Sequence, residues 1–227
     1  STQDRSSAAS DVYKRQSLPF TLNSAVDNLC KNEFDHYRAK AKPHPMFVEH
    51  GIDAVPFAHE KMDEWRNNFK GVRHINNEDG YNFGGAVDDI WQKPSGELIV
   101  VDVKSTAKNI FDWEDTYSKW EYAKGYKRQL EMYQWLMRMN GFEVAPEAYL
   151  VYYNGKKNEP MFDQKLTFDL HLVRLECDDS WVEGEVLAAV KTLNGHAMPP
   201  AASDCPNCNY LRKRWEVSQK NPKDLID

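Results

Sequence analysis

The stretch "GAVDDIWQKPSGELIVVDVKST", Gly85–Thr106, predicts two strands joined by a tight turn at Pro94-Ser95-Gly96. Its second half, "ELIVVDVK", is apolar on both faces except for Asp102 and Lys104, so we expect a central strand rather than an edge strand. Charged side chains in a central strand need a partner or a purpose. The hairpin therefore indicates both the middle of a sheet and the place to look for function.

The turn determines which residues face each other. Antiparallel pairing about Ser95 places Asp88 opposite Asp102, and a slip of one residue would put Asp89 there instead. Two carboxylates about 5 Å apart repel by about 3 kcal/mol at an effective dielectric constant of about 20. A cation relieves this repulsion, and Mg²⁺ or Mn²⁺ prefers such oxygen ligands. Lys104, on the same face as Asp102, can neutralise charge or position a water. The alternative is the solvent face of a half-exposed strand.

The pattern on either side of the hairpin predicts a mixed α/β domain. Apolar residues at helical spacing indicate a first helix with one apolar stripe, formed by Val26, Leu29, Cys30, Phe34 and Tyr37. Helices are expected within residues 17–39, 57–71, 117–141 and 180–195, and strands within 71–78, 81–92, 97–105, 146–155 and 166–177. The order is helix, helix, three strands, helix, strand, strand, helix, followed by a Pro-rich loop and a basic tail.

The chain has 227 residues, 41% of them hydrophobic and 12% aromatic, which argues for a packed core and against general disorder. No run of about 18 apolar residues is present, so no membrane-spanning helix is expected. Residues 1–16, "STQDRSSAASDVYKRQ", are polar and without an apolar period, and we expect a non-native leader there. The other expected parts are an α/β domain over 17–200 and a C-terminal Cys-pair loop and basic tail over 201–227.

The formal net charge is −6, from 29 Lys and Arg residues against 35 Asp and Glu residues. A net acidic chain is not a general nucleic-acid binder, although a local basic surface or metal ions held by its carboxylates can still bind nucleic acid. The four cysteines, without a secretory signal, do not indicate a disulfide framework. We therefore expect a reducing compartment and a cytoplasmic location.

Gly85-Ala86-Val87-Asp88, followed about fourteen residues later by Asp102-Val103-Lys104, resembles the PD-(D/E)XK nuclease superfamily. It most resembles the RecB-like branch, which includes the CRISPR-associated four-cysteine exonucleases. "AHEKMDEW" upstream, "YKRQLEMY" downstream and the C-terminal "CPNC" also match that branch, so the resemblance spans roughly residues 20 to 210. It implies a restriction-endonuclease-like core, with a central mixed β-sheet flanked by helices.

The resemblance also implies roles for individual residues. The metal ligands would be His59, Asp88, Asp102 and the carbonyl of Val103. Lys104 would orient the attacking water, and Gln129 and Tyr133, on one helix face, would line the DNA or help to hold Lys104. Glu60 is the alternative to His59, and core packing is the alternative role of Tyr133.

The pair Cys205-Pro-Asn-Cys208 can bind one metal ion from a tight loop, but a complete site needs two more ligands. Three interpretations stay open: a [4Fe–4S] cluster, a Zn²⁺ site, or a Cys pair without metal. The first two require further ligands, which we expect from a natural N-terminus in place of the expected leader. Cys30 and Cys177 are expected to be buried as small hydrophobic residues.

A basic, aromatic-rich helix segment is the expected DNA contact surface. Its cationic residues would contact phosphates, and the neighbouring aromatic residues Trp120, Tyr122 and Tyr126 would stack on unpaired bases. The alternative is a solvated helix face with aromatic residues in the core. The expected phosphate contacts are Lys124, Lys127 and Arg128.

The sequence therefore predicts a divalent-metal-dependent DNA nuclease that hydrolyses phosphodiester bonds, with an exonuclease acting on single-stranded ends favoured by the resemblance. One alternative is a catalytically inactive domain on the same fold that binds DNA or a repair partner. Retention of both aspartates and the lysine argues against that alternative. Another is a metal-dependent hydrolase with a different substrate. The oligomeric state is not predicted.

Overall fold

The computed structural model describes residues 21–197 and 199–219. The expected leader, residues 1–16, lies outside the described residues. The chain divides into two compact units, Ser1–Val182 and Glu183–Asp227, which are treated separately here. The expected domain limits at residues 17 and 200 stay predictions. No helix within the described ranges is long and apolar enough to cross a membrane.

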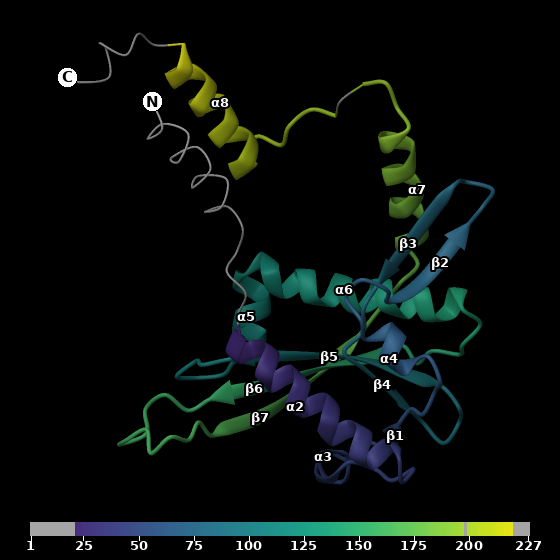
Figure 1. Ribbon diagram of the computed structural model, residues 1–227, viewed down its shortest axis with the longest axis vertical. Coiled ribbons are helices and arrows are strands. Elements are labelled where there is room, and N and C mark those ends of the chain that lie inside the picture. Colours follow the sequence, from purple (N-terminus) through teal and green to yellow (C-terminus); the bar gives the residue numbers. More distant parts are fainter. Residues whose placement is uncertain (1–20, 198, 220–227) are drawn as a thin grey trace, which may run out of the picture. The chain divides into compact units, whose positions relative to one another are not determined.

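A five-stranded mixed sheet forms the centre of the first unit (Figure 1). The neighbours β5 and β6 are parallel, and the other adjacent pairs are antiparallel. β5 is the middle strand, as its apolar pattern predicts. The strands in spatial order are β1 (Val55–Pro56), β4 (Asp89–Gln92), β5 (Leu98–Thr106), β6 (Glu147–Gly155) and β7 (Phe168–Glu176). The predicted α/β class with a central mixed sheet is confirmed.

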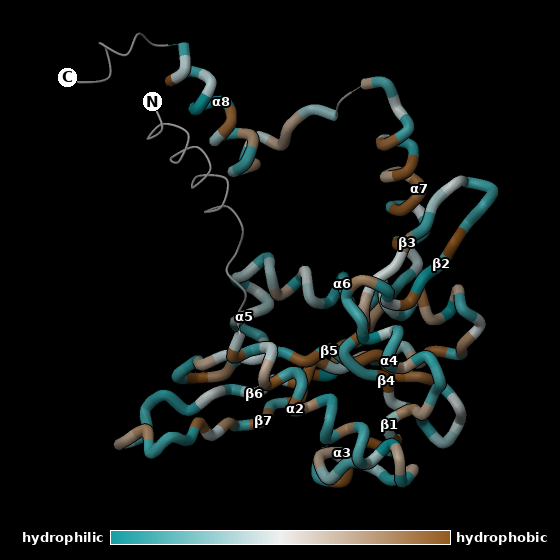
Figure 2. Tube along the Cα trace, in the orientation of Figure 1, coloured by the Kyte–Doolittle hydropathy of each residue, from teal (hydrophilic) through white to brown (hydrophobic). Residues whose placement is uncertain are grey.

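Helices cover both faces of this sheet. Alternate residues of β5 point to opposite sides, so each face presents its own side chains to a different helix. On one face, Val101 and Val103 pack in a core cluster with Cys30 and Phe34 of α2. On the other face α6 packs, with Leu130 and Leu136 among its buried residues. Figure 1 shows α2 and α6 on opposite sides of the sheet, and Figure 2 shows hydrophobic residues along β4 and β5. The helices of this unit are α2 (Thr21–Arg38), α3 (Pro45–Glu49), α4 (Met62–Trp65), α5 (Trp113–Lys119) and α6 (Glu121–Met139).

The strand predicted over residues 81–92 is two strands in two different sheets. β3 (Tyr81–Gly85) pairs with β2 (Val72–Asn76) in a separate two-stranded sheet, whereas β4 belongs to the main sheet. The start of β2 and the end of β3 are packed closely, because a Cβ atom at Gly71 would lie 2.5 Å from the carbonyl oxygen of Gly85. Residues 86–88 lie between the two strands, outside both.

The helix predicted over residues 57–71 is wrong except for the single turn α4. The reason is a backbone hydrogen bond at the edge of the sheet, where Phe57 N donates to Ile90 O at 2.9 Å and keeps the chain extended after β1. Phe69, which lies within the predicted helix, is 92% exposed. The helix predicted over 117–141 is interrupted at Trp120, whose φ of −121° and ψ of 120° separate α5 from α6.

The second unit contains two helices among its described residues. α7 (Val182–Leu193), which begins at the last residue of the first unit, agrees with the prediction for residues 180–195. α8 (Pro206–Ser218) forms where the sequence indicated a loop and a tail, and its first turn begins at the proline of the Cys pair. Proline is favoured at this position because its missing N–H would have no partner in the first helical turn.

Candidate active site

Asp88 and Asp102 face each other where β4 separates from β5. The register pairs Asp89 with Val101, so the next position along places Asp88 opposite Asp102, as the turn predicted. β4 begins at Asp89, and Asp88 therefore lies just outside the strand. Its Oδ2 accepts a hydrogen bond from Val103 N at 2.8 Å. The Asp88 carboxylate thus accepts the hydrogen bond from Val103 N that a backbone carbonyl group would accept if β4 began earlier in the chain.

Gly85 explains why the chain can pass so close to the site. A Cβ atom at Gly85 would lie 2.6 Å from Cε1 of Tyr133, so the tyrosine ring occupies the space that any side chain would need. The glycine at this position in the motif is therefore a packing requirement between β3 and α6. The sequence does not reveal this contact, because the two residues are 48 positions apart.

Asp102 is a buried carboxyl group with an incompletely compensated charge. It is only 2% exposed, and burial raises its pKa from 3.8 to about 7. The negative charge of Asp88 raises the pKa further, whereas the Lys104 ammonium group lowers it. Lys104 Nζ forms an ion pair with Asp102 Oδ2 and lies 4.6 Å from the centroid of the Tyr126 ring. Both aspartates and the lysine are therefore in one site.

Gln129 and Tyr133 border the same site from α6. Gln129 Nε2 donates a hydrogen bond to Tyr133 Oη at 2.7 Å. Burial raises the pKa of Tyr133 to about 12, and the charges of Asp102 and Asp88 contribute to that rise. Tyr133 therefore keeps its proton at neutral pH and is both a packing residue and part of the site wall.

Asp89, the alternative to Asp88, has other partners. It is fully buried, and its two carboxylate oxygens pair with Arg38 Nη2 at 2.6 Å and Arg66 Nη2 at 2.5 Å. These contacts link β4 to α2 and to the residue after α4. Asp89 is therefore a structural ion-pair residue, and Asp88 is the one that faces Asp102.

His59 is not brought to the aspartate pair. It lies in the loop before α4, where its ring stacks on Trp65 at a centroid distance of 4.4 Å. Its Nδ1 accepts a hydrogen bond from Lys61 N at 3.1 Å, and the alternative residue Glu60 is exposed. Across residues 21–197 and 199–219, no three His, Cys, Asp or Glu side chains are grouped so that they could hold a metal ion. The predicted set of His59 with both aspartates is thus not assembled in this structure.

An open cleft of about 390 Å³ adjoins Lys104. β5 contributes Val103, Lys104 and Ser105, α6 contributes Tyr126, and α2 contributes Asn23, Ser24, Val26 and Asp27. The polar face of α2 was not predicted as part of the site. Its pair Asp27 and Lys31 has the spacing of an ordinary helix-surface ion pair, which gives no signal of function.

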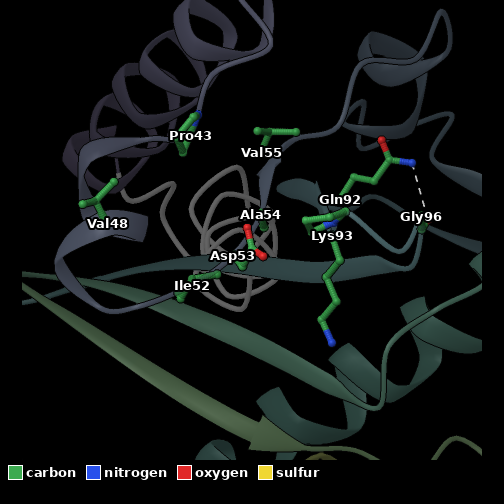
Figure 3. A pocket seen from close by; sticks show the side chains of 10 residues that line it. Pro43, Val48, Ile52, Asp53, Ala54, Val55, Gln92, Lys93 and Gly96 are labelled. Carbon is green, nitrogen blue, oxygen red and sulfur yellow. Dashed lines mark hydrogen bonds between the residues drawn. The ribbon is translucent and has the colours of Figure 1, made fainter.

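A larger cleft, of about 520 Å³, lies at the opposite, turn end of the hairpin (Figure 3). Its lining includes Val48, Ile52 and Val55, and its single acidic residue is Asp53. Gln92 Nε2 donates to Gly96 O at its edge, at 3.4 Å. Without a pair of carboxylates in its lining, this cleft does not offer the chemistry found at Asp88 and Asp102.

The predicted phosphate contacts on α6 are paired with acidic residues of the same helix. Arg128 Nη2 lies 2.9 Å from Glu121 Oε1, and Lys124 Nζ lies 3.4 Å from Glu121 Oε2. Lys127 Nζ lies 3.8 Å from Glu131 Oε1. This surface is therefore closer to charge balance than the sequence suggested.

The predicted Cys pair lies in the second unit. Cys205 is the N-cap of α8, and its Sγ accepts a hydrogen bond from Cys208 N at 3.4 Å, which lowers the Cys205 pKa. Cys30 is buried in the core of the first unit as predicted, and burial raises its pKa to about 12. All four cysteines are free thiols.

Comparisons with known proteins support the geometry. The family model described as "PD-(D/E)XK nuclease superfamily" matches residues 7–212. The chain therefore belongs to the PD-(D/E)XK nuclease superfamily, as predicted, whereas the RecB-like branch stays a prediction. No curated protein matches the chain. A crystal structure titled "Putative exonuclease", from Eubacterium rectale, is 15% identical, with 88% of this chain and 78% of that chain covered and a TM-score of 0.35. At this level of similarity the crystal structure adds no functional argument.

The donor atoms of the site fit a hard divalent cation. Mg²⁺ is usually held in proteins by one or two carboxylates, together with waters and substrate phosphates. Asp88 and Asp102 supply two such carboxylates, and the raised pKa of Asp102 shows that Lys104 alone does not offset the buried charge. A dication between the two groups would offset both causes of the raised pKa, which are burial first and the charge of Asp88 second.

Proposed function

We propose that this protein is a divalent-metal-dependent DNA exonuclease that hydrolyses phosphodiester bonds and acts on single-stranded ends. The observation that carries the proposal is the opposed pair Asp88 and Asp102 with the Lys104 ammonium group in contact, beside an open cleft. Membership of the nuclease superfamily supports nuclease activity. Metal dependence, the DNA substrate and the preference for single-stranded ends are parts of the proposal.

In this mechanism Asp88, Asp102 and the carbonyl of Val103 would hold Mg²⁺ or Mn²⁺. When bound, the cation supplies charge neutralisation at the phosphate and acidification of a water. Lys104 orients the attacking water, and its ion pair with Asp102 and its contact with Tyr126 restrict where the ammonium group can move. The ligand set omits His59, because its ring is stacked on Trp65.

Gln129 and Tyr133 act as supporting residues in this proposal. The Tyr133 ring packs against Gly85 and so fixes the chain that leads to Asp88. Its hydroxyl group stays protonated and hydrogen-bonded to Gln129. The pair thus keeps the wall of the site rigid without taking part in proton transfer.

Exposed aromatic residues beside the cleft support a single-stranded substrate. Trp120 is 55% exposed and Tyr122 is 46% exposed, and the Tyr122 ring lies 5.7 Å from that of Tyr126, which lines the cleft. Exposed rings of this kind stack on unpaired bases, which a duplex does not offer. The basic residues of α6 are secondary contacts here, because Glu121 and Glu131 pair with them.

Four free thiols agree with a reducing, cytoplasmic location.

The Cys pair is a separate proposal. Cys205 and Cys208 can contribute two thiolates to a Zn²⁺ or [4Fe–4S] site that two further ligands would complete. An absorbance spectrum and metal analysis of anaerobically purified protein test this directly. Neither metal is needed for the cleavage proposed at Asp88 and Asp102.

The test is cleavage of end-labelled single-stranded and duplex DNA in Mg²⁺, Mn²⁺ or EDTA. Wild type is compared with Asp102→Ala and Lys104→Ala, and with the matched controls Asp53→Ala and Lys157→Ala, which remove the same charges at exposed positions. We expect metal-dependent shortening of single strands by wild type and both controls, and loss of at least a hundredfold in rate in the two site variants. Equal background activity in all five proteins would refute catalysis at this site. DNA binding without cleavage would favour the non-catalytic alternative.

A further inference from the structure

Helix α2 places a second lysine at the aspartate pair. Lys31 Nζ lies 2.7 Å from Asp27 Oδ2 and 3.8 Å from Asp88 Oδ1. Asp88 therefore has the Val103 N–H at one oxygen and the Lys31 ammonium group near the other. Lys104 approaches from β5, so the two lysines come from two different elements.

A purely helix-stabilising role does not explain where Lys31 lies. Ion pairs four residues apart on a helix surface contribute little to stability, and their lysines keep the ammonium group in water. The Lys31 side chain is only 19% exposed, and its ammonium group is near a carboxylate of another element. Asp27 Oδ1 is also buried, with no hydrogen-bond partner in the described part of the chain. Asp27 itself lines the cleft beside Lys104.

The formal charges of the site indicate that Lys31 can bind a negatively charged group once a divalent cation is present. Counted with every group ionised, as a bound dication would leave them, the carboxylates of Asp27, Asp88 and Asp102 and the ammonium groups of Lys31 and Lys104 sum to −1. A divalent cation at Asp88 and Asp102 would change the sum to +1, and it would remove the attraction of Lys31 for Asp88. A phosphodiester group carries −1 and would make the site neutral.

We propose that Lys31 binds a phosphate of the DNA strand in the cleft, and that Asp27 is the positioning residue that holds Lys31 beside Asp88. This inference rests on the proposed nuclease function, because the phosphate belongs to its substrate. Lys104 then acts on water from β5 while Lys31 holds the strand from α2, next to Asp27 in the cleft lining. Lysine is suited to this role as a compact cation that reaches a phosphate without a fixed hydrogen-bond geometry.

The test measures binding of a fluorescent single-stranded oligothymidine by anisotropy, in EDTA and in Ca²⁺, over a series of salt concentrations. The variants are Lys31→Ala, Lys31→Gln and Lys31→Arg, with Lys42→Ala as the control that removes an exposed lysine just after α2. Loss of one phosphate contact should weaken binding about tenfold in Lys31→Ala and reduce the salt slope by about 0.7. Lys31→Arg should retain both, and Lys42→Ala should match wild type.

Asp27→Asn tests the positioning role. It keeps the ammonium group of Lys31, so the salt slope should stay at the wild-type value while KM rises about threefold and kcat changes little, since positioning mainly affects ground-state binding here. A lower salt slope in Asp27→Asn would contradict the assigned division of roles.

Failure of this inference differs from failure of the nuclease proposal. If Lys31→Ala, or Lys31→Gln where the alanine variant does not fold, has the affinity and salt slope of Lys42→Ala, then Lys31 does not bind phosphate, whether or not wild type cleaves DNA. If the Lys31 variants lose the contact but wild type does not cleave, the binding role stands and the catalytic proposal fails.

Discussion

Replacing Asp102 by Asn should make the metal-free protein more stable while it removes cleavage. The ionised carboxylate is buried beside a second carboxylate, and its pKa is raised from 3.8 to about 7. Asn has nearly the same shape without the charge. The site would thus be a place where function is kept at the expense of stability.

The size of the effect follows from the raised pKa. Each pKa unit corresponds to about 1.4 kcal/mol, so a rise of about three units means that ionised Asp102 costs about 4 kcal/mol at high pH. Below pH 3.8 the group is protonated in both the folded and the unfolded chain, and there is no penalty. The penalty grows as the pH rises towards 7, because the unfolded chain loses this proton first. Between pH 5.5 and 8 the gain from Asp102→Asn should therefore increase by about 2 kcal/mol.

The attraction of Lys104 for the ionised carboxylate is already contained in the pKa of about 7, so it is not subtracted again. Exchange of the hydrogen bonds of the carboxyl group for those of the amide should give an offset of about 1 kcal/mol that does not depend on pH. The dependence of the gain on pH is unaffected by such an offset. It is therefore the more informative quantity.

The assay is urea unfolding of both proteins in EDTA, followed by tryptophan fluorescence from pH 5.5 to 8. Asp53→Asn, an exposed acid at the other cleft, is the control and should show no change of this kind with pH. A difference between Asp102→Asn and wild type that stays constant, or that falls as the pH rises, would refute the reasoning about burial.

Three other outcomes follow from the same structure. Gly85→Ala should lose about 1–3 kcal/mol of stability and reduce cleavage in the end-label assay, because its methyl group would collide with the Tyr133 ring. The control Gly184→Ala, which is in open space on a helix, should not destabilise the protein. Equal unfolding midpoints for the two variants would contradict the packing argument. Asp89→Asn should lose about 3–5 kcal/mol in urea unfolding, because Arg38 and Arg66, both half-buried, then keep only Asp35 as an ion-pair partner among the described residues. Asp88→Asn should instead lose cleavage with a smaller change in stability. A large loss of stability in Asp88→Asn together with a loss of cleavage alone in Asp89→Asn would exchange the structural and active-site roles of the two aspartates. Mg²⁺ at about 100 times its wild-type Kd should stabilise wild type by about 2.7 kcal/mol in the same urea experiment and Asp102→Asn by about 1.4 kcal/mol or less, so equal stabilisation of both would place the ion elsewhere.

The hairpin and its register could be predicted from the sequence because both are local. The turn at Pro94-Ser95-Gly96 fixes the pairing, and the apolar run of β5 fixes its central position. The break between β3 and β4 could not be predicted, since residues 81–92 have one continuous strand-like pattern. The break follows Gly85, where Gly71 and the Tyr133 ring of α6 come close, and only the folded chain brings these residues together.

The site was predictable where one element carries several of its residues. Asp102, Val103 and Lys104 are on one strand, and Gln129 and Tyr133 are on one helix. His59 was predicted on a helix that does not form, because Phe57 pairs with the sheet instead. The contribution of Asp27 and Lys31 could not be foreseen, because an acid and a lysine four residues apart on a helix occur on many solvated surfaces.

The central claim is that Asp88 and Asp102 together hold a divalent cation, and titration calorimetry with Mn²⁺ tests it most directly. Wild type and Asp53→Asn should bind one Mn²⁺ ion per chain, whereas Asp88→Asn and Asp102→Asn should bind it at least tenfold more weakly. Unchanged Mn²⁺ affinity in both site variants, with their fold intact by circular dichroism, would contradict the account.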